Sequence, residues 1–250
     1  MFNYLKIQSL EFHLKLKIPI TVVEKLAEKL GIKFNNLDIL QQAVTHRSYL
    51  NEHKDYKLDH NERLEFLGDA VLELVVTEYL YENYPNPEGE LTNWRAALVN
   101  GEMLAKLSRN LGVEEFLLMS RGEAKDTGKA RQYLLANAFE AITGAIYLDR
   151  KEKGYAVAKD FIMKNVVVEL PEIIKSKSYM DPKSRFQEEA QERVGITPSY
   201  RVLEETGPDH SKKFVVGVYL NEELAAKGEG LSKQEAQRNA AAAALEAKGW

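Results

Sequence analysis

The sequence predicts a multidomain chain in which an all-α domain is followed by a small α+β domain of order α-β-β-β-α. Two observations lead to this fold class. From Thr21 to Val168, apolar residues recur at three- and four-residue spacing, the period of helices with one buried face. Further along, apolar residues alternate from Phe214 to Leu220, as in a strand with one buried face. The 250 residues are enough for one medium and one small hydrophobic core.

The change of pattern sets the expected domain boundaries. We expect an N-terminal extension of unassigned order over residues 1–20, the helical domain over 21–169, a linker over 170–180 and the α+β domain over 181–250. The linker is expected because periodicity is lost there and because Pro171 precedes a short run of Lys and Ser.

Six helices are expected in the first domain. They lie near residues 22–30, 37–43, 61–83, 91–111, 133–148 and 155–168. Gly31, Gly112 and Gly154 stand at helix ends or turns, where glycine is favoured. Pro85 and Pro87 separate the third helix from the fourth.

The second domain begins at Asp181-Pro182, because Asp caps a helix and Pro suits its first position. Three strands are expected near residues 199–204, 213–220 and 223–227. Ser232 and Glu235 form a capping-box pattern, which predicts the start of the final helix.

Composition limits the classes of function that the chain can have. The formal net charge is −4, so a nucleic acid would have to be bound by local basic clusters or through metal ions. The absence of cysteine excludes disulfides, thiolate catalysis and cysteine zinc sites, and favours a reducing compartment, the cytoplasm. Charged residues interrupt residues 1–20 too often for a signal peptide or a membrane span, so no membrane association is expected.

Acidic residues on the third expected helix carry the candidate chemistry. Glu62, Glu65 and Asp69 are spaced to lie on one helical face. Because the helix is otherwise apolar, these carboxylates would be costly to bury unless a cation offset them, and Mg2+ prefers oxygen ligands. For these three acids alone, a solvated acidic stripe on an amphipathic helix is the better explanation, because such stripes are common.

A second polar pair favours the metal-site interpretation. Asn137 and Glu140 are three residues apart on another expected helix, and the small residues Ala141, Gly144 and Ala145 follow them. Small residues let two helices approach closely. The two helices could therefore bring oxygen ligands from both segments to one cation.

Residues 61–70, NERLEFLGDA, resemble the signature of the ribonuclease III family. Similar blocks surround it at residues 45–49, 88–92 with Arg95, 121–123 and 139–149, so the resemblance covers roughly Val22 to Asp149. It implies a Mg2+-dependent endonuclease that cuts double-stranded RNA. Mn2+ can substitute in such a site, and no organic cofactor is expected.

The resemblance also implies roles for individual residues. Glu65, Asn137 and Glu140 would ligate Mg2+, Asp69 and Glu140 would be catalytic, and Glu62 would hold RNA or support the metal shell. In-line hydrolysis would leave 5′-phosphate and 3′-hydroxyl ends. The implied substrates are ribosomal RNA precursors and some messenger RNAs.

Phe66, a large apolar residue within the signature, would be a core residue on helical pattern alone. The resemblance instead implies that it lies at the interface of a homodimer. Two centres related by a two-fold axis would cut the two RNA strands at staggered positions and leave short 3′ overhangs.

Asn137 departs from the family pattern, which usually has Asp there. An amide oxygen can ligate Mg2+ without adding charge, so weaker metal binding with retained activity is expected. Two alternatives stay open: a non-cleaving RNA-binding protein that keeps this fold, and an unrelated all-α metal hydrolase with an appended module.

The second domain resembles a double-stranded RNA-binding domain over Asp181 to about Lys248. Such modules read the shape of A-form RNA through its 2′-hydroxyls and phosphates. The resemblance implies RNA contacts by Gln187, Glu188, Pro208, His210, Lys212, Lys213 and Lys233. Ten Lys and Arg against twelve Asp and Glu give this domain a charge of −2, so modest affinity and strong salt sensitivity are expected.

Overall fold

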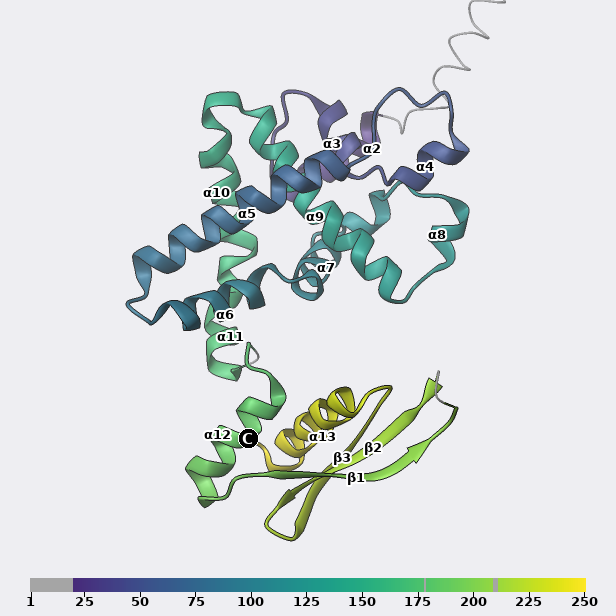
Figure 1. The fold of residues 1–250 in the computed structure, drawn as a ribbon. Helices are drawn as coiled ribbons and strands as arrows, with labels where there is room; N and C mark the ends of the chain where they lie inside the picture. The colour runs from purple at the N-terminus through teal and green to yellow at the C-terminus, as the bar shows by residue number, and fades with distance from the viewer. Residues whose placement is uncertain (1–19, 178, 209–210) are drawn as a thin grey trace, which may run out of the picture. The chain divides into compact units, whose positions relative to one another are not determined.

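The computed structural model describes residues 20–177, 179–208 and 211–250 (Figure 1). The chain divides into two compact units with the boundary after Ile173, and each unit is described by itself. The N-terminal extension expected over residues 1–20 lies almost entirely outside the described residues. Across the described residues, no helix is long and apolar enough to cross a membrane.

The first unit is helical, as predicted. Its α-helices are α2 (Ile20–Leu30), α3 (Leu37–Ala43), α4 (Arg47–Glu52), α5 (Glu62–Asn83), α6 (Glu88–Val99), α7 (Gly101–Asn110), α8 (Arg121–Lys125), α9 (Lys129–Asp149), α10 (Gly154–Asn165) and α11 (Leu170–Ser176), the last of which crosses the boundary between the units. Short 3-10 turns lie at Val113–Phe116, Lys151–Lys153 and Val167–Glu169. Figure 1 shows the long helices α5 and α9 crossing in this unit.

Helix α9 is the centre of the helical core. Eleven of its residues are buried, among them Leu135, Phe139, Ile142 and Ile146. Helix α5 packs against it with Leu64, Leu72, Val75 and Val76, and α7 and α10 pack on the other sides. The core therefore holds α9 and α5 rigidly against each other.

One predicted helix is wrong in its extent. The segment 91–111, expected as a single helix, is two helices separated at Asn100. Asn100 adopts extended backbone angles, and its side chain accepts a hydrogen bond from the amide of Met103, which caps α7. Apolar spacing continues across the break, so periodicity alone did not reveal it.

Short helices were also missed. Helices α4 and α8 have only six and five residues, too few for a periodic pattern to be visible. Helix α11 forms within the segment expected to be a linker, because Leu170 and Ile173 are buried on one face of it.

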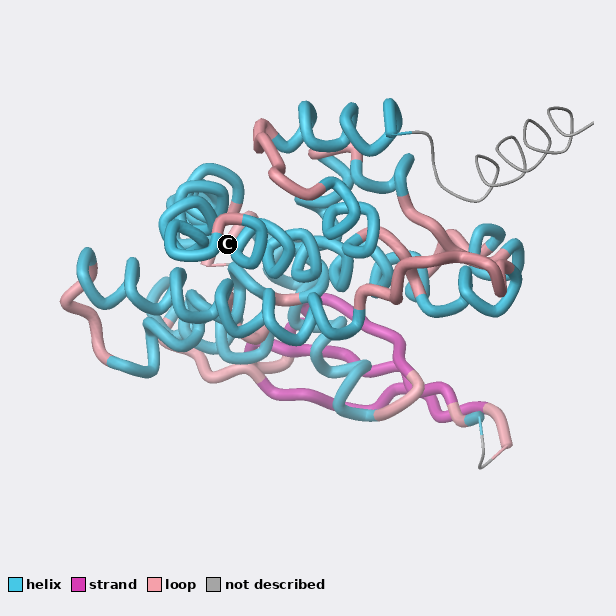
Figure 2. The backbone as a smooth tube through the Cα atoms, turned by 90° about the horizontal axis from the view of Figure 1, so that it is seen from above, coloured by secondary structure: helices cyan, strands magenta, loops and turns pink. Residues whose placement is uncertain are grey.

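The second unit has the predicted α-β-β-β-α order. It consists of α12 (Pro182–Val194), β1 (Ser199–Thr206), β2 (Lys213–Leu220), β3 (Glu223–Gly230) and α13 (Lys233–Lys248). The strands form one antiparallel sheet of order β1-β2-β3, drawn in magenta in Figure 2. Asp181 and Ser232 cap α12 and α13 with their side chains, as the sequence predicts.

Alternate residues of β2 build the second core. Phe214, Val216, Val218 and Leu220 are all buried, which confirms the predicted alternation. Phe186 of α12 and Ala240, Ala241 and Ala244 of α13 pack against the last two of them. Small alanines let α13 lie close to the sheet, and Gly228 makes the closest approach, since a Cβ there would meet the amide nitrogen of Ala240 at 2.1 Å.

Candidate active site

Two glycines set the distance between α5 and α9. A Cβ on Gly68 would meet the carbonyl oxygen of Glu140 at 1.7 Å, and one on Gly144 would meet the carbonyl oxygen of Leu64 at 2.3 Å. Both distances are far below van der Waals contact, so the two backbones touch where any side chain would hold them apart. This contact confirms the close helix approach predicted from the small residues.

The glycine contact places acidic residues of both helices near one another. Burial, with the nearby charges of Asp69 and Glu65, raises the pKa of Glu140 to about 8. Burial, with the charges of Glu62 and Asp69, also raises the pKa of Glu65, while a hydrogen bond from Asn137 opposes that rise. The structure therefore brings together Glu65, Asp69, Asn137 and Glu140, which are far apart in sequence.

The chemistry of these side chains fits a hard cation. All four offer oxygen atoms, and Oε2 of Glu65 is buried without a hydrogen-bond partner. Among residues 20–177, 179–208 and 211–250, however, no three His, Cys, Asp or Glu side chains converge tightly enough to hold a metal ion.

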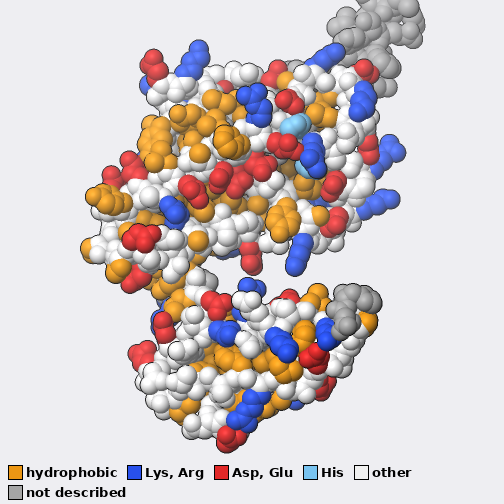
Figure 3. Space-filling model, in the orientation of Figure 1, with side chains coloured by type: hydrophobic (Ala, Val, Ile, Leu, Met, Phe, Trp, Pro, Cys, Tyr) orange, Lys and Arg blue, Asp and Glu red, His pale blue; other side chains and the backbone are white. Residues whose placement is uncertain are grey.

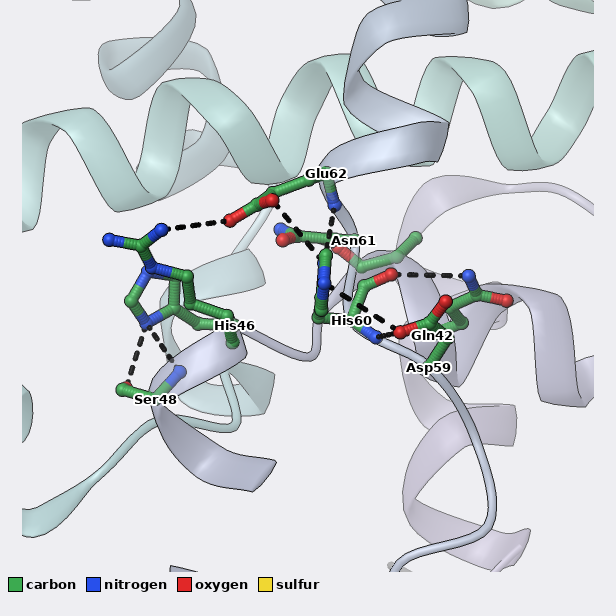
Figure 4. Close-up of polar contacts among 9 residues, drawn as sticks. Gln42, His46, Ser48, Asp59, His60, Asn61 and Glu62 are labelled. Carbon is green, nitrogen blue, oxygen red and sulfur yellow. Dashed lines mark hydrogen bonds and ion pairs between the residues drawn. The ribbon is translucent and has the colours of Figure 1, made fainter. Parts of the chain in front are cut away.

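Glu62 is the first residue of α5 (Figure 4), and its charge acts on Glu65 of this group. Its carboxylate is 3.6 Å from the guanidinium of Arg47 and 3.8 Å from Nδ1 of His60. The Glu62 amide donates a hydrogen bond to the same His60 nitrogen. Sequence reasoning assigned Glu62 a supporting role but missed Arg47 and His60, whose closeness in space depends on the turn before α5.

His46 precedes Arg47 and fixes the start of α4. Its Nδ1 accepts a hydrogen bond from the amide of Ser48 and contacts the Ser48 hydroxyl at 2.8 Å (Figure 4). Burial lowers the pKa of His46 despite the opposing charge of Glu123. A neutral His46 is therefore favoured, and it holds Arg47 beside Glu62 as part of α4.

A stripe of exposed apolar side chains runs along α5 beside the acidic residues. Phe66 is 81% exposed, Leu74 56% and Tyr81 81%. Their spacing places them on one helical face, next to the face that carries Glu62, Glu65 and Asp69. In Figure 3, acidic side chains form a band on the helical unit with apolar side chains beside it. The helical-core alternative for Phe66 is wrong.

The candidate RNA contacts of the second unit lie on several elements. Gln187 and Glu188 are exposed on α12, Pro208 and Lys213 are exposed at the ends of the β1–β2 connection, and Lys233 is exposed at the start of α13. Lys212 is half-buried and donates to the Glu205 carboxylate at 2.9 Å. His210 lies outside the described residues.

A hollow between α12, β1 and α13 was not foreseen. Its lining includes Gln187, and also Lys183, Tyr200 and Arg238. Lys183 donates to the side-chain oxygen of Gln237 at 2.7 Å and lies over the Tyr200 ring at 5.0 Å. The lysine is thus held close to the start of α13, which is a position that the sequence of α12 alone does not reveal.

Comparisons with known proteins give a family match for each of the two parts of the chain. Residues 36–170 match the Ribonuclease-III-like family, and residues 182–248 match the double-stranded RNA binding motif. The chain is 43% identical to Ribonuclease 3 of Enterococcus faecalis over 222 residues, which is 88% of this chain and 95% of that protein. It is 41% identical to Ribonuclease 3 of Leptospira interrogans over 242 residues, 96% of this chain and 95% of that protein.

A solved structure gives the same result for the first unit. The nuclease domain of ribonuclease III from Campylobacter jejuni has a TM-score of 0.52 and 41% sequence identity to this chain. The match covers 60% of this chain and 99% of that domain. That structure is described as showing flexibility in a region involved in dimer formation.

Proposed function

Because the chain belongs to the ribonuclease III family and is a double-stranded RNA endonuclease, we propose that Glu65, Asp69, Asn137 and Glu140 form its active site. The observation that supports this assignment is the glycine contact between α5 and α9. It holds carboxylates of the two helices close together, and among the described residues no ion pair to a basic side chain is found for Glu65, Asp69 or Glu140. Burial, with the charges of Asp69 and Glu65, raises the pKa of Glu140 to about 8. Such uncompensated acids are typical of sites that bind a cation.

Glu65, Asn137 and Glu140 would hold Mg2+, or Mn2+ in its place, through carboxylate and amide oxygens. A divalent ion bound there would supply stabilisation of the charge that develops on the phosphate and on the leaving 3′ oxygen. Asp69 and Glu140 would be the catalytic residues, placed beside the reacting water and phosphate. Glu62 would lie next to them, held by its ion pair with Arg47. The products would carry 5′-phosphate and 3′-hydroxyl ends.

The α5 stripe of Phe66, Leu74 and Tyr81 would form the interface of a homodimer. A two-fold interface buries the same patch on both subunits, and antiparallel α5 helices would set Phe66 against the other end of the partner's stripe. A hollow lined by Leu80, Tyr81, Tyr84 and Leu91 lies at that end of α5. Replacing Phe66 by Asp should give monomers in sedimentation equilibrium, and an unchanged dimer would argue against this interface.

Pairing of two active sites across the dimer would give staggered cuts and short 3′ overhangs. The C-terminal unit would hold the duplex through its 2′-hydroxyls and phosphates. The residues that would make these contacts are Gln187, Glu188, Pro208, His210, Lys212, Lys213 and Lys233. Ribosomal RNA precursors and some messenger RNAs, in the cytoplasm, are the substrates we propose.

The decisive experiment uses Glu140→Gln, which keeps the shape of the side chain and removes its charge. Cleavage of a long RNA duplex should fall by at least about a hundredfold, while duplex binding in metal-free buffer is retained. Mg2+ should raise the melting temperature of the unmutated chain and raise that of the variant less. Retained cleavage would remove Glu140 from the site.

The rival function, RNA binding without cleavage, has Asn137 in its favour. It predicts that the unmutated chain leaves a duplex intact at every Mg2+ concentration, even when Mg2+ stabilises the protein. The duplex assay with the ends mapped therefore separates the two functions.

A further inference from the structure

We propose that Glu205 limits the affinity of the C-terminal unit for double-stranded RNA, because its carboxylate holds two lysines that would otherwise bind phosphate. The inference rests on the proposed role of Lys212 and Lys233 as RNA contacts. Lys212 and Lys233 would strengthen RNA binding, whereas Glu205 in β1 would weaken it.

Glu205 uses each of its two carboxylate oxygens for a different lysine. Oε1 accepts a hydrogen bond from Nζ of Lys212 at 2.9 Å, and Oε2 lies 3.9 Å from Nζ of Lys233. Lys233 also lies over the ring of Phe214, 5.6 Å from its centroid. One lysine precedes β2 and the other begins α13, so the carboxylate joins two parts of the candidate RNA surface.

Packing explains why these three residues meet. Glu205 lies opposite Phe214 in the β1–β2 register. Phe214 is buried together with Val216 and Ala236, the fourth residue of α13. The start of α13 is thereby fixed beside the same end of the sheet, within reach of Glu205.

The two lysines can exchange their contacts with Glu205 for contacts with RNA phosphates. The side chains of Glu205, Lys212 and Lys233 are 39%, 34% and 58% exposed, and ion pairs of this exposure contribute little to folding. A carboxylate and a phosphate offer the same kind of anionic oxygen to an ammonium group. RNA phosphates must therefore compete with Glu205 for the two lysines, and part of their binding free energy is used to displace it.

Glu205→Gln is the test, and Glu204→Gln is its matched control. Both changes remove one negative charge from neighbouring positions of β1. Glu204 is exposed and belongs to none of the ion pairs found among the described residues. The full chain is titrated with an RNA duplex in metal-free buffer, so that binding is measured without cleavage, over a range of salt concentrations.

We expect Glu205→Gln to bind duplex about two- to tenfold more tightly than Glu204→Gln, the range for one or two exposed ion pairs that no longer have to be broken. The plot of log affinity against log salt should be steeper by up to about 0.9 for each lysine released. In a Lys233→Gln background the gain should shrink, since one of the two partners is already missing.

Equal affinity and equal salt slope for the two glutamine variants would overturn the inference, and so would weaker binding by Glu205→Gln. The Lys233→Gln variant by itself tests the underlying function. If Lys233→Gln binds as tightly as the unmutated chain, the proposed RNA surface is wrong. If it binds more weakly while the two glutamate variants agree, only the role of Glu205 is wrong.

Discussion

Glu140 in the helical unit and Glu189 in the C-terminal unit are both largely withdrawn from water, but the charges of the side chains around them have opposite signs. Glu140 has Asp69 and Glu65 beside it, and its pKa is raised to about 8. Glu189 is bonded by Arg193 at 2.7 Å and Lys177 at 2.9 Å, which hold its pKa below the usual value. The C-terminal unit pairs Glu189 with basic residues of its own, whereas no ion pair to Glu140 is found among the described residues of the helical unit.

A carboxylate bonded to basic residues contributes to the stability of the fold, whereas one surrounded by other acids is suited to the chemistry. A paired buried acid stabilises the native state at neutral pH, and an unpaired one destabilises it. The helical unit tolerates the destabilisation because the α5–α9 core around Phe139 and Leu72 is extensive and fully buried. Substitutions in the α5–α9 contact, at the two glutamates and at Asn137 should therefore change the stability of the chain by decreasing amounts.

Gly68→Ala should have the largest effect. Its methyl group would overlap the carbonyl of Glu140, so α5 and α9 must separate, with a loss of about 3 kcal/mol in unfolding free energy, the upper end for overpacking. Thermal unfolding measures the loss, and cleavage should fall with it. Gly89→Ala is the control, because nothing lies within 4 Å of a Cβ there. Equal stability of the two variants would show that the glycine contact is not what holds the helices.

The two glutamates should respond to pH in opposite directions. Because the folded pKa of Glu140 is raised, metal-free protein should lose stability as pH rises from about 4.5 to about 8, and Glu140→Gln should flatten that decline. Because the folded pKa of Glu189 is lowered, its stabilisation is present above its unfolded pKa and is lost as pH falls.

At pH 7, Glu189→Gln should therefore lower the unfolding free energy by about 1.5–3 kcal/mol, the range for hydrogen bonds to charged groups. Glu140→Gln should raise the melting temperature at the same pH. Unfolding curves between pH 5 and about 8.5 in the presence of a chelator give both measurements. A shift of the two variants in the same direction would contradict the comparison.

Asn137→Asp should have the smallest effect on stability and an informative one on metal binding. The change removes the hydrogen bond that Asn137 gives Glu65 and adds a further negative charge to the group. Metal-free protein should melt slightly lower, and the Mg2+ concentration for half-maximal cleavage should fall several-fold, about 1 kcal/mol in binding. An unchanged Mg2+ requirement would show that the amide oxygen already suffices.

Much of the candidate site could be predicted because it depends on local spacing. Glu65, Gly68 and Asp69 lie within little more than one helical turn, and Asn137, Glu140 and Gly144 lie within two turns of another helix. The helical period alone places each set on one face. That the two faces meet was an inference from the small residues, and the structure confirms it.

Other features could not be predicted because they depend on contacts between distant segments. The pairing of Glu205 with Lys233 requires the register of β1 on β2 and the docking of α13 at the same end of the sheet. The break at Asn100 depends on a single hydrogen bond, in which the Asn100 side chain accepts from a backbone amide while its own backbone leaves the helical conformation. Apolar periodicity carries neither kind of information.

The glycine contact also separates the parts of the sequence that can change in length from those that cannot. We expect the loops that connect the helices between α5 and α9 to tolerate changes in length without moving the four oxygen-bearing side chains, since the crossing itself holds them. One residue inserted between Glu65 and Gly68, or between Glu140 and Gly144, would rotate the side chains on either side by about 100° relative to each other. Cleavage should therefore survive insertions in the connecting loops and be lost after insertions in the two short helical segments. That result would show that the crossing fixes the angle between the side chains on each helix.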